Sequence, residues 1–184
     1  MVNPAEIQLL SIAVTIVLAL VGYFVTYLNN LRLARRADRL TYITSQIRDF
    51  YGPLYVITQT SRVLYDAFRI ESQGRHGIDA DLMWRTWAQA VFIPMNAELE
   101  RVITTKSYLI REAQMHPALL RFCAHSAACR ALSAQWAQND FRSVHPSIQF
   151  PEELDKYAIA SYQSLREEEH LLRDATARKI ALKP

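Results

Sequence analysis

The sequence predicts an all-α protein in which an N-terminal transmembrane helix continues into an antiparallel cytoplasmic helical bundle. Three observations support this prediction. The run from Ile7 to Leu31 has no charged residue, the chain of 184 residues has only four glycines, and apolar residues recur at spacings of three and four. Folds with many tight turns use more glycine than this. No segment shows the alternation typical of strands, so helices are the simplest prediction.

The apolar run is long enough to cross a bilayer. A transmembrane helix needs roughly 20 predominantly apolar residues, and Ile7 to Leu28 is dominated by Ile, Leu, Val, Ala, Phe and Tyr. A cleaved signal peptide would have a basic start, a shorter apolar core and a small-residue cleavage site. Asn3 offers an N-cap and Pro4 a first helical residue. We therefore predict a membrane anchor over residues 1–31.

Charges on the two sides of the anchor predict its orientation. Residues 1–6 have no Lys or Arg, whereas four arginines follow the apolar run: Arg32, Arg35, Arg36 and Arg39. Positive residues favour the cytoplasmic side of a membrane. We therefore expect a single-pass protein with the N-terminus outside, the arginines at the membrane surface and the C-terminal domain in the cytoplasm.

Small residues lie on one face of the anchor, at spacings of four, four, three and four. These residues are Ser11, Thr15, Ala19, Gly22 and Thr26. Such a face lets a second transmembrane helix approach closely. We therefore predict that the membrane helix associates with a protein partner or with a second copy of the chain.

The same face continues beyond the membrane as a seven-residue, coiled-coil-like repeat: Thr26, Leu33, Leu40, Ile47 and Leu54. This continuity predicts one helix from about Pro4 to Tyr51. Residues 32–52 are its juxtamembrane part, and the repeat there should face mostly the chain's own core.

Residues 53–184 are predicted to form the bundle, with prolines and glycines marking the helix limits. The expected helices run from Pro53 to about Glu71, from near Asp79 through a kink at Pro94, from Pro117 to Gln138, and onward from Pro151. The third helix has an apolar stripe made of Met83, Trp87, Val91, Met95, Leu99 and Val102. Asn96 follows the kink, where its amide could bond a freed backbone carbonyl.

Helical spacing also predicts which faces of the last two helices pack inward. In the fourth helix this face is Leu120, Ala124, Ala127, Ala131 and Ala134. In the last helix it is Leu154, Ala158, Ser161, Leu165 and Leu172. The run Glu167-Glu168-Glu169 is interpreted as a solvated face.

The sequence contains no pattern that indicates catalysis. A phosphate-binding glycine loop, a nucleophile elbow, an HExxH motif and an EF-hand are all missing from it. His125 and Cys129 share a helix face, but two ligands do not make a metal site, so His125 is interpreted as a core residue. A net charge of +3 without a broad basic surface disfavours nucleic acid. We expect a non-enzyme without cofactor or metal.

Aromatic residues offer an alternative to a bundle without a ligand, namely a ligand pocket. Tyr51, Tyr55, Trp84, Trp87 and Trp136 could line a ligand pocket, although aromatics at helical spacing more often belong to a core.

Several short motifs occur in a fixed order. They are Phe50-Tyr51-Gly52-Pro53-Leu54-Tyr55, Trp84-Arg85-Thr86-Trp87, Phe92-Ile93-Pro94-Met95-Asn96, His125, Trp136 and Phe150-Pro151. Over roughly residues 40–172 the chain resembles an uncharacterised group of bacterial single-span membrane proteins. Phe92-Ile93 stands where that group is expected to have a Phe-Met pair. The resemblance implies a bacterial inner membrane and brings no known activity.

Three functions remain open from the sequence. The leading hypothesis is an interaction module, an accessory or scaffold subunit of a membrane assembly. The first alternative is a membrane effector of a stress or phage-defence system. The second is a helical ligand sensor that uses the aromatic region near Tyr51 and Trp84.

Overall fold

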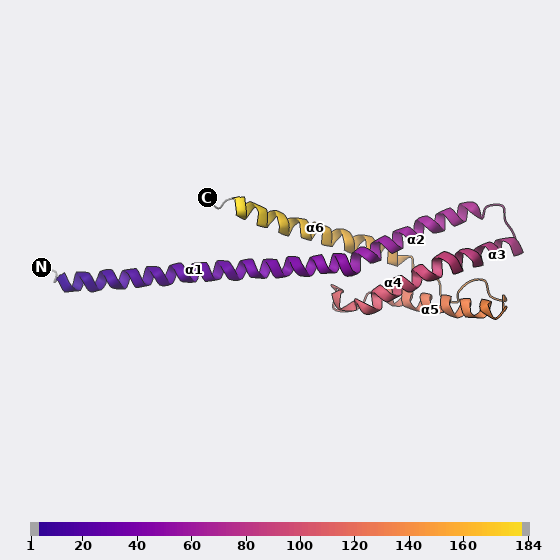
Figure 1. Cartoon of the computed structure of the whole chain (residues 1–184), viewed down its shortest axis with the longest axis horizontal. Coiled ribbons are helices and arrows are strands. Elements are labelled where there is room, and N and C mark those ends of the chain that lie inside the picture. The colour runs from indigo at the N-terminus through magenta and orange to yellow at the C-terminus, as the bar shows by residue number, and fades with distance from the viewer. Residues whose placement is uncertain (1–3, 182–184) are drawn as a thin grey trace. The chain divides into compact units, whose positions relative to one another are not determined.

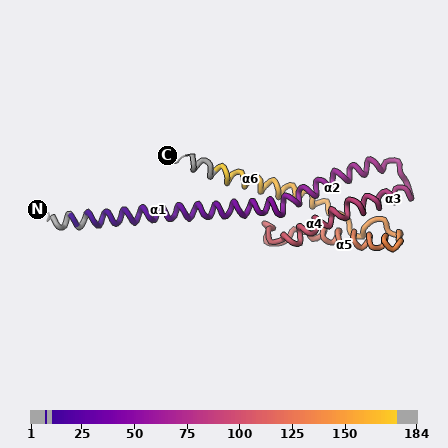
Figure 2. Tube along the Cα trace, viewed as in Figure 1, coloured from indigo at the N-terminus to yellow at the C-terminus, as the bar shows by residue number. Residues whose placement is uncertain are grey.

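The computed structural model describes the backbone of residues 4–181 and the side chains of residue 8 and residues 11–174. Figure 1 labels the helices, and Figure 2 traces the chain through them. The elements are α1 (Pro4–Gln46), the π-helical turn η1 (Ile47–Tyr51), α2 (Gly52–Glu71), α3 (Ile78–Trp87), the π-helical turn η2 (Ala88–Phe92), α4 (Ile93–Thr105), the 3₁₀ turn η3 (Ser107–Leu109), α5 (Pro117–Ala137) and α6 (Glu153–Ala181). Within the described range there is no strand, and the predicted all-α class is confirmed.

The chain divides into two compact units, Met1–Tyr42 and Ile43–Pro184. The predicted limits after residues 31 and 52 come from composition and proline, and they remain predictions. The described part of the first unit, residues 4–42, lies within α1. By length and composition, its described part is apolar enough to cross a membrane. None of the most apolar window is buried.

The second unit is an antiparallel four-helix bundle, as predicted. Its four rods are α2, the α3–η2–α4 run, α5 and α6, and successive rods run in opposite directions (Figure 1). Contacts join α2 to α4, α4 to α5, α5 to α6 and α6 to α2, which closes the ring. The loop between α2 and α3 turns at Gly74 and Gly77, whose φ angles are +80° and +60°.

Both helix-breaking prolines follow a π-helical turn. Pro53 and Pro94 are each the second residue of a new helix, after η1 and η2 respectively. A proline ring clashes with the carbonyl four residues earlier in an α-helix, and that carbonyl lies inside the π turn in both cases. The wider turn absorbs the clash through a bond from residue i to residue i−5, from Gly52 N–H to Ile47 O and from Ile93 N–H to Ala88 O. The predicted break and kink are therefore both π turns.

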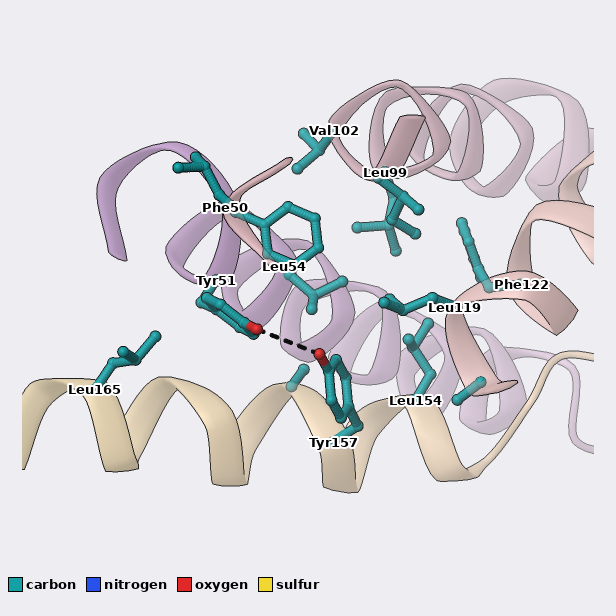
Figure 3. Packing of buried hydrophobic residues seen from close by; sticks show 14 of the residues in the cluster. Phe50, Tyr51, Leu54, Leu99, Val102, Leu119, Phe122, Leu154, Tyr157 and Leu165 are labelled. Atoms are coloured by element: carbon teal, nitrogen blue, oxygen red, sulfur yellow. Dashed lines mark hydrogen bonds between the residues drawn. The ribbon is translucent and has the colours of Figure 1, made fainter. Parts of the chain in front are cut away.

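The main core brings together the end of α1, η1, α2, α4, α5 and α6. Its largest fully buried side chains include Phe50, Tyr51, Leu54, Leu119 and Phe122, which face one another in Figure 3. Of the juxtamembrane repeat, Leu33 is 42% exposed, Ile47 packs against this core and Leu54 is fully buried in it. The expectation that the repeat over residues 32–52 faces the chain's own core is therefore wrong at Leu33 and confirmed at Ile47.

The predicted inner face of α5 is wrong. Leu120, Ala127, Ala131 and Ala134 are exposed, whereas the opposite face is buried and carries Leu119, Phe122, His125, Ser126, Cys129, Leu132 and Trp136. Both faces have helical spacing. The buried one removes far more apolar area from water, because Phe, Leu and Trp are larger than Ala.

The predicted inner face of α6 is confirmed, since Leu154, Ala158 and Leu165 are buried. The interpretation of residues 167–169 as a solvated face is wrong for Glu169, which is 5% exposed. Its carboxylate lies between Arg166, at 2.5 Å, and Arg173, at 2.7 Å. These two guanidinium groups compensate the cost of burying the charge.

Candidate functional site

The predicted small face of the membrane helix is exposed along the first unit. Ser11, Thr15, Ala19, Gly22 and Thr26 are all exposed, and a methyl group at Gly22 would meet nothing within 4 Å. The hydroxyls of Thr15 and Thr26 donate at 2.9 Å to the backbone carbonyls of Ser11 and Gly22. Because these two hydroxyls donate within the helix, the face offers a neighbour close packing rather than hydrogen-bond donors from Thr15 and Thr26.

The four predicted surface arginines lie further along the same helix. The side chains of Arg32, Arg35, Arg36 and Arg39 are exposed. Exposed guanidinium groups beside an apolar stretch can reach lipid phosphates without being desolvated.

Tyr51 is the hub of a partly buried polar network in the second unit. It is the last residue of η1, and its side chain is fully buried. Its hydroxyl accepts a 3.0 Å bond from the backbone N–H of Arg111 and donates to Glu112 Oε2 at 3.2 Å. Tyr157, from α6, donates to the same carboxylate oxygen at 3.1 Å. The two hydroxyls lie 3.4 Å apart, as the dashed line in Figure 3 shows.

Both phenols of this network remain protonated at neutral pH. Burial raises the pKa of Tyr51, and burial together with the Tyr51 hydroxyl raises the pKa of Tyr157. A neutral phenol is a hydrogen-bond donor rather than a nucleophile or a base. The network therefore fastens the 106–116 segment to η1 and α6, and it holds the Glu112 carboxylate in place.

A cleft of about 400 Å³ opens beside this network. It is lined by Tyr51, Arg111 and Glu112 on one side and by α6 residues on the other, namely Ala160, Ser161, Ser164 and Leu165. A cleft of this volume is within the range of small-molecule sites. Arg111, Glu112 and Tyr157 were not singled out from the sequence, because the 106–116 segment has no helical periodicity and its partners are distant in the chain.

Pro53 and Tyr55 flank the hub in sequence. Pro53 sets the start of α2. Tyr55 is half-buried and stacks on Tyr162 of α6, with ring centroids 4.7 Å apart and an interplanar angle of 8°. Pro53 therefore sets where α2 begins, and Tyr55 packs α2 against α6.

The tryptophans lie in a different part of the second unit from Tyr51. Trp84 and Trp87 pack on Phe68 and Phe92, and Trp84 Nε1 donates to Val144 O at 2.8 Å. Tyr51 lies in the main core, whereas Trp84 and Trp136 belong to a second, smaller cluster. The structure therefore does not join the predicted aromatic residues into one pocket.

Asn96 and His125 meet at Cys129, between α4 and α5. Asn96 Nδ2 lies 3.8 Å from the Cys129 sulfur, so the amide bonds a thiol and the predicted bond to a freed carbonyl is wrong. His125 Nδ1 is 2.6 Å from the carbonyl oxygen of Ile148, and Nε2 is 3.4 Å from Cys129. Because a carbonyl only accepts, Nδ1 carries the proton and Nε2 accepts from the thiol.

Burial keeps this cluster neutral. It lowers the pKa of His125 and raises the pKa of Cys129. A neutral thiol is a poor nucleophile, so the contact holds α5 to α4 and to the following loop. In the described part of the chain, no three His, Cys, Asp or Glu residues are grouped so that they could hold a metal ion.

Comparisons of the chain with family models, with curated proteins and with solved structures find no match.

Proposed function

We propose that this chain is a membrane-anchored helical interaction module, an accessory or scaffold subunit of a bacterial inner-membrane assembly. The observation that carries the proposal is the apolar length of α1. From Ile12 to Tyr27 its large side chains are more than half exposed. Soluble proteins rarely expose so large a continuous apolar surface, and a bilayer removes that cost.

The small face of the same helix supports an association within the membrane. Thr15 and Thr26 satisfy their hydroxyls within the helix, and Gly22 leaves open space beside the backbone. Lipid-embedded helices associate through such close packing. The exposed arginines that follow favour a cytoplasmic bundle.

The anchor and its orientation can be tested in cells. The full chain should stay in the membrane pellet after alkaline carbonate extraction, and a C-terminal reporter that folds only in the cytoplasm should be active. Release of the chain into the carbonate supernatant would contradict the proposal.

The association can be tested with a photo-crosslinking amino acid. We expect adducts from positions 15 and 26, on the small face, and few from the matched positions 17 and 24 on the opposite face. Gly22→Leu should lower the adduct yield by roughly tenfold, since it blocks close approach, whereas Phe24→Leu should not. The mass of the adduct separates a second copy from another protein. Equal yields from both faces would contradict a specific interface.

A further inference from the structure

The cleft beside Tyr51 carries a fixed carboxylate. Glu112 Oε2 accepts from both Tyr51 and Tyr157, at 3.2 and 3.1 Å. Both tyrosines are held by the core, at 0% and 9% exposure. Two rigid donors on one oxygen restrict the orientation of the carboxylate. Among the described side chains none bonds Oε1, which leaves that oxygen for a cationic donor.

The same cleft has a guanidinium group next to this carboxylate, and a ligand could replace its present partners. Arg111 Nη1 lies 3.3 Å from Ser164 Oγ, and Nη2 lies 3.2 Å from Glu168 Oε2. The Arg111 side chain is 46% exposed and that of Glu168 is 27% exposed. An exposed ion pair of this kind contributes little to stability, so a ligand carboxylate can take up the guanidinium at low cost.

The floor of the cleft is apolar. Leu165 is 1% exposed and lines the cleft together with Tyr51 and Ala160. A ligand with an apolar side chain would cover these atoms, and burial of that area would add to its affinity.

We propose that this cleft binds a free α-amino acid with an apolar side chain. Its ammonium group binds Glu112, its carboxylate binds Arg111 and Ser164, and its side chain lies on Leu165 and Tyr51. A dicarboxylate would be repelled by Glu112, and a diamine by Arg111. The pairing of opposite charges in one small cleft therefore selects a zwitterion. This site is independent of the membrane-helix face.

The test uses the full chain in mild detergent with leucine as the first probe. Isothermal titration calorimetry should show leucine binding at micromolar to millimolar Kd. Leucinamide lacks the carboxylate and N-acetyl-leucine lacks the ammonium group, so both should bind at least about tenfold more weakly. The remaining proteinogenic amino acids, measured the same way, should rank apolar above acidic and basic ones.

Three variants locate the binding in this cleft. Arg111→Gln and Glu112→Gln should each weaken leucine by about tenfold or more. Ser164→Ala, at an exposed position outside the tyrosine network, should weaken it less and leave the circular dichroism spectrum unchanged. The matched control is Arg121→Gln, which removes a guanidinium from a second cleft, beside Phe150, and should leave leucine binding unchanged.

Some results would overturn the proposal. The first is that no amino acid binds at millimolar concentration. The second is that leucine and leucinamide bind equally well. The third is that leucine binds with the same affinity to all three cleft variants. If the Glu112 variant unfolds, Ser164→Ala still tests the proposal, because this change does not touch the buried phenols.

Discussion

The two proline junctions of the bundle have the same backbone and different surroundings. In each, a five-residue π turn precedes a helix whose second residue is proline. At the residue before the proline, one junction has Gly52 and the other has Ile93. At the end of the π turn, one has Tyr51, whose hydroxyl binds the 106–116 segment, and the other has Phe92, which packs among aromatic rings. The wider turn accommodates the proline at both junctions, and the adjacent side chains decide what the turn connects.

The glycine of the first junction is required by a close approach. A Cβ at Gly52 would lie 2.4 Å from the carbonyl oxygen of Ile47, the acceptor of the Gly52 N–H. The ring of Tyr162 is also near, at 3.9 Å. Ile93 has a Cβ at the equivalent position, so the second π turn leaves room where the first does not.

The largest expected effect comes from filling this space. Gly52→Ala should destabilise the bundle by about 2 kcal/mol, because the methyl group forces the turn or Ile47 to move. Chemical denaturation of the full chain in mild detergent, followed by circular dichroism, measures the change. Gly22→Ala is the control, since nothing lies within 4 Å of its Cβ position. Equal denaturation midpoints for the two variants would contradict the prediction, because they would mean that η1 accommodates a Cβ atom as well as η2 does.

The next largest expected effect on stability distinguishes the first junction, where Tyr51 joins the polar network, from the second, where Phe92 packs among aromatic rings. Tyr51→Phe should cost about 1.5 kcal/mol, because the Arg111 N–H and the Glu112 carboxylate both lose a partner. Hydrogen exchange should show the Arg111 amide losing protection while the core helices keep theirs. The reciprocal change, Phe92→Tyr, should also destabilise, since it buries a hydroxyl among rings. If Arg111 exchanges equally slowly in Tyr51→Phe, the network does not hold the segment.

The two junctions should also differ in their response to acid. Beyond the second junction, Asn96 and His125 both contact Cys129, and burial lowers the pKa of His125. The unfolded chain takes up a proton below pH about 6.5 while the folded histidine stays neutral. This contribution to stability is present above that pH and is lost as the pH falls toward the folded pKa. For one proton its slope is at most about 1.4 kcal/mol per pH unit.

Denaturation midpoints between pH about 7.5 and 5 measure this slope. His125→Gln keeps a side-chain donor for the Ile148 carbonyl but does not titrate, so its slope should be shallower. An unchanged slope would assign the acid sensitivity to another group.

The smallest effect should be common to both junctions. Pro53→Ala and Pro94→Ala should each destabilise by about 0.5 kcal/mol, mainly because the unfolded chain gains freedom. The missing N–H matters little at the second position of a helix. Thermal unfolding measures both variants. A difference above about 1 kcal/mol between them would mean that one proline also holds its π turn in place.

Local patterns predicted most of this fold. The charge-free run, the apolar stripe of the third helix and the prolines at 117 and 151 act over a few residues, and the helices follow them closely. The inner face of α5 was different. Its alanine face and its Phe122 face have equal spacing, and only the packed neighbours distinguish them.

The candidate cleft was predictable only at Tyr51. Tyr51 and Tyr157 are 106 residues apart, and Glu112 lies in a segment without helical periodicity. Their meeting depends on the closed ring of helices, which no short pattern encodes. The π turns were also missed, because proline predicts a disturbance of the helix and not which form it takes.

The bundle also contains its own optical reporter. All three tryptophans of the chain lie at or near the second junction, and two indole N–H groups donate at 2.8 Å to carbonyls of one loop, Trp84 to Val144 and Trp136 to Ser143. Indole emission responds to loss of such a bond and to entry of water. Tryptophan-selective fluorescence will therefore follow this loop and α3, while the tyrosine hub at the other junction does not contribute to it. A single added tryptophan at exposed Tyr108, in the 106–116 segment that Tyr51 binds, would make the two junctions visible separately.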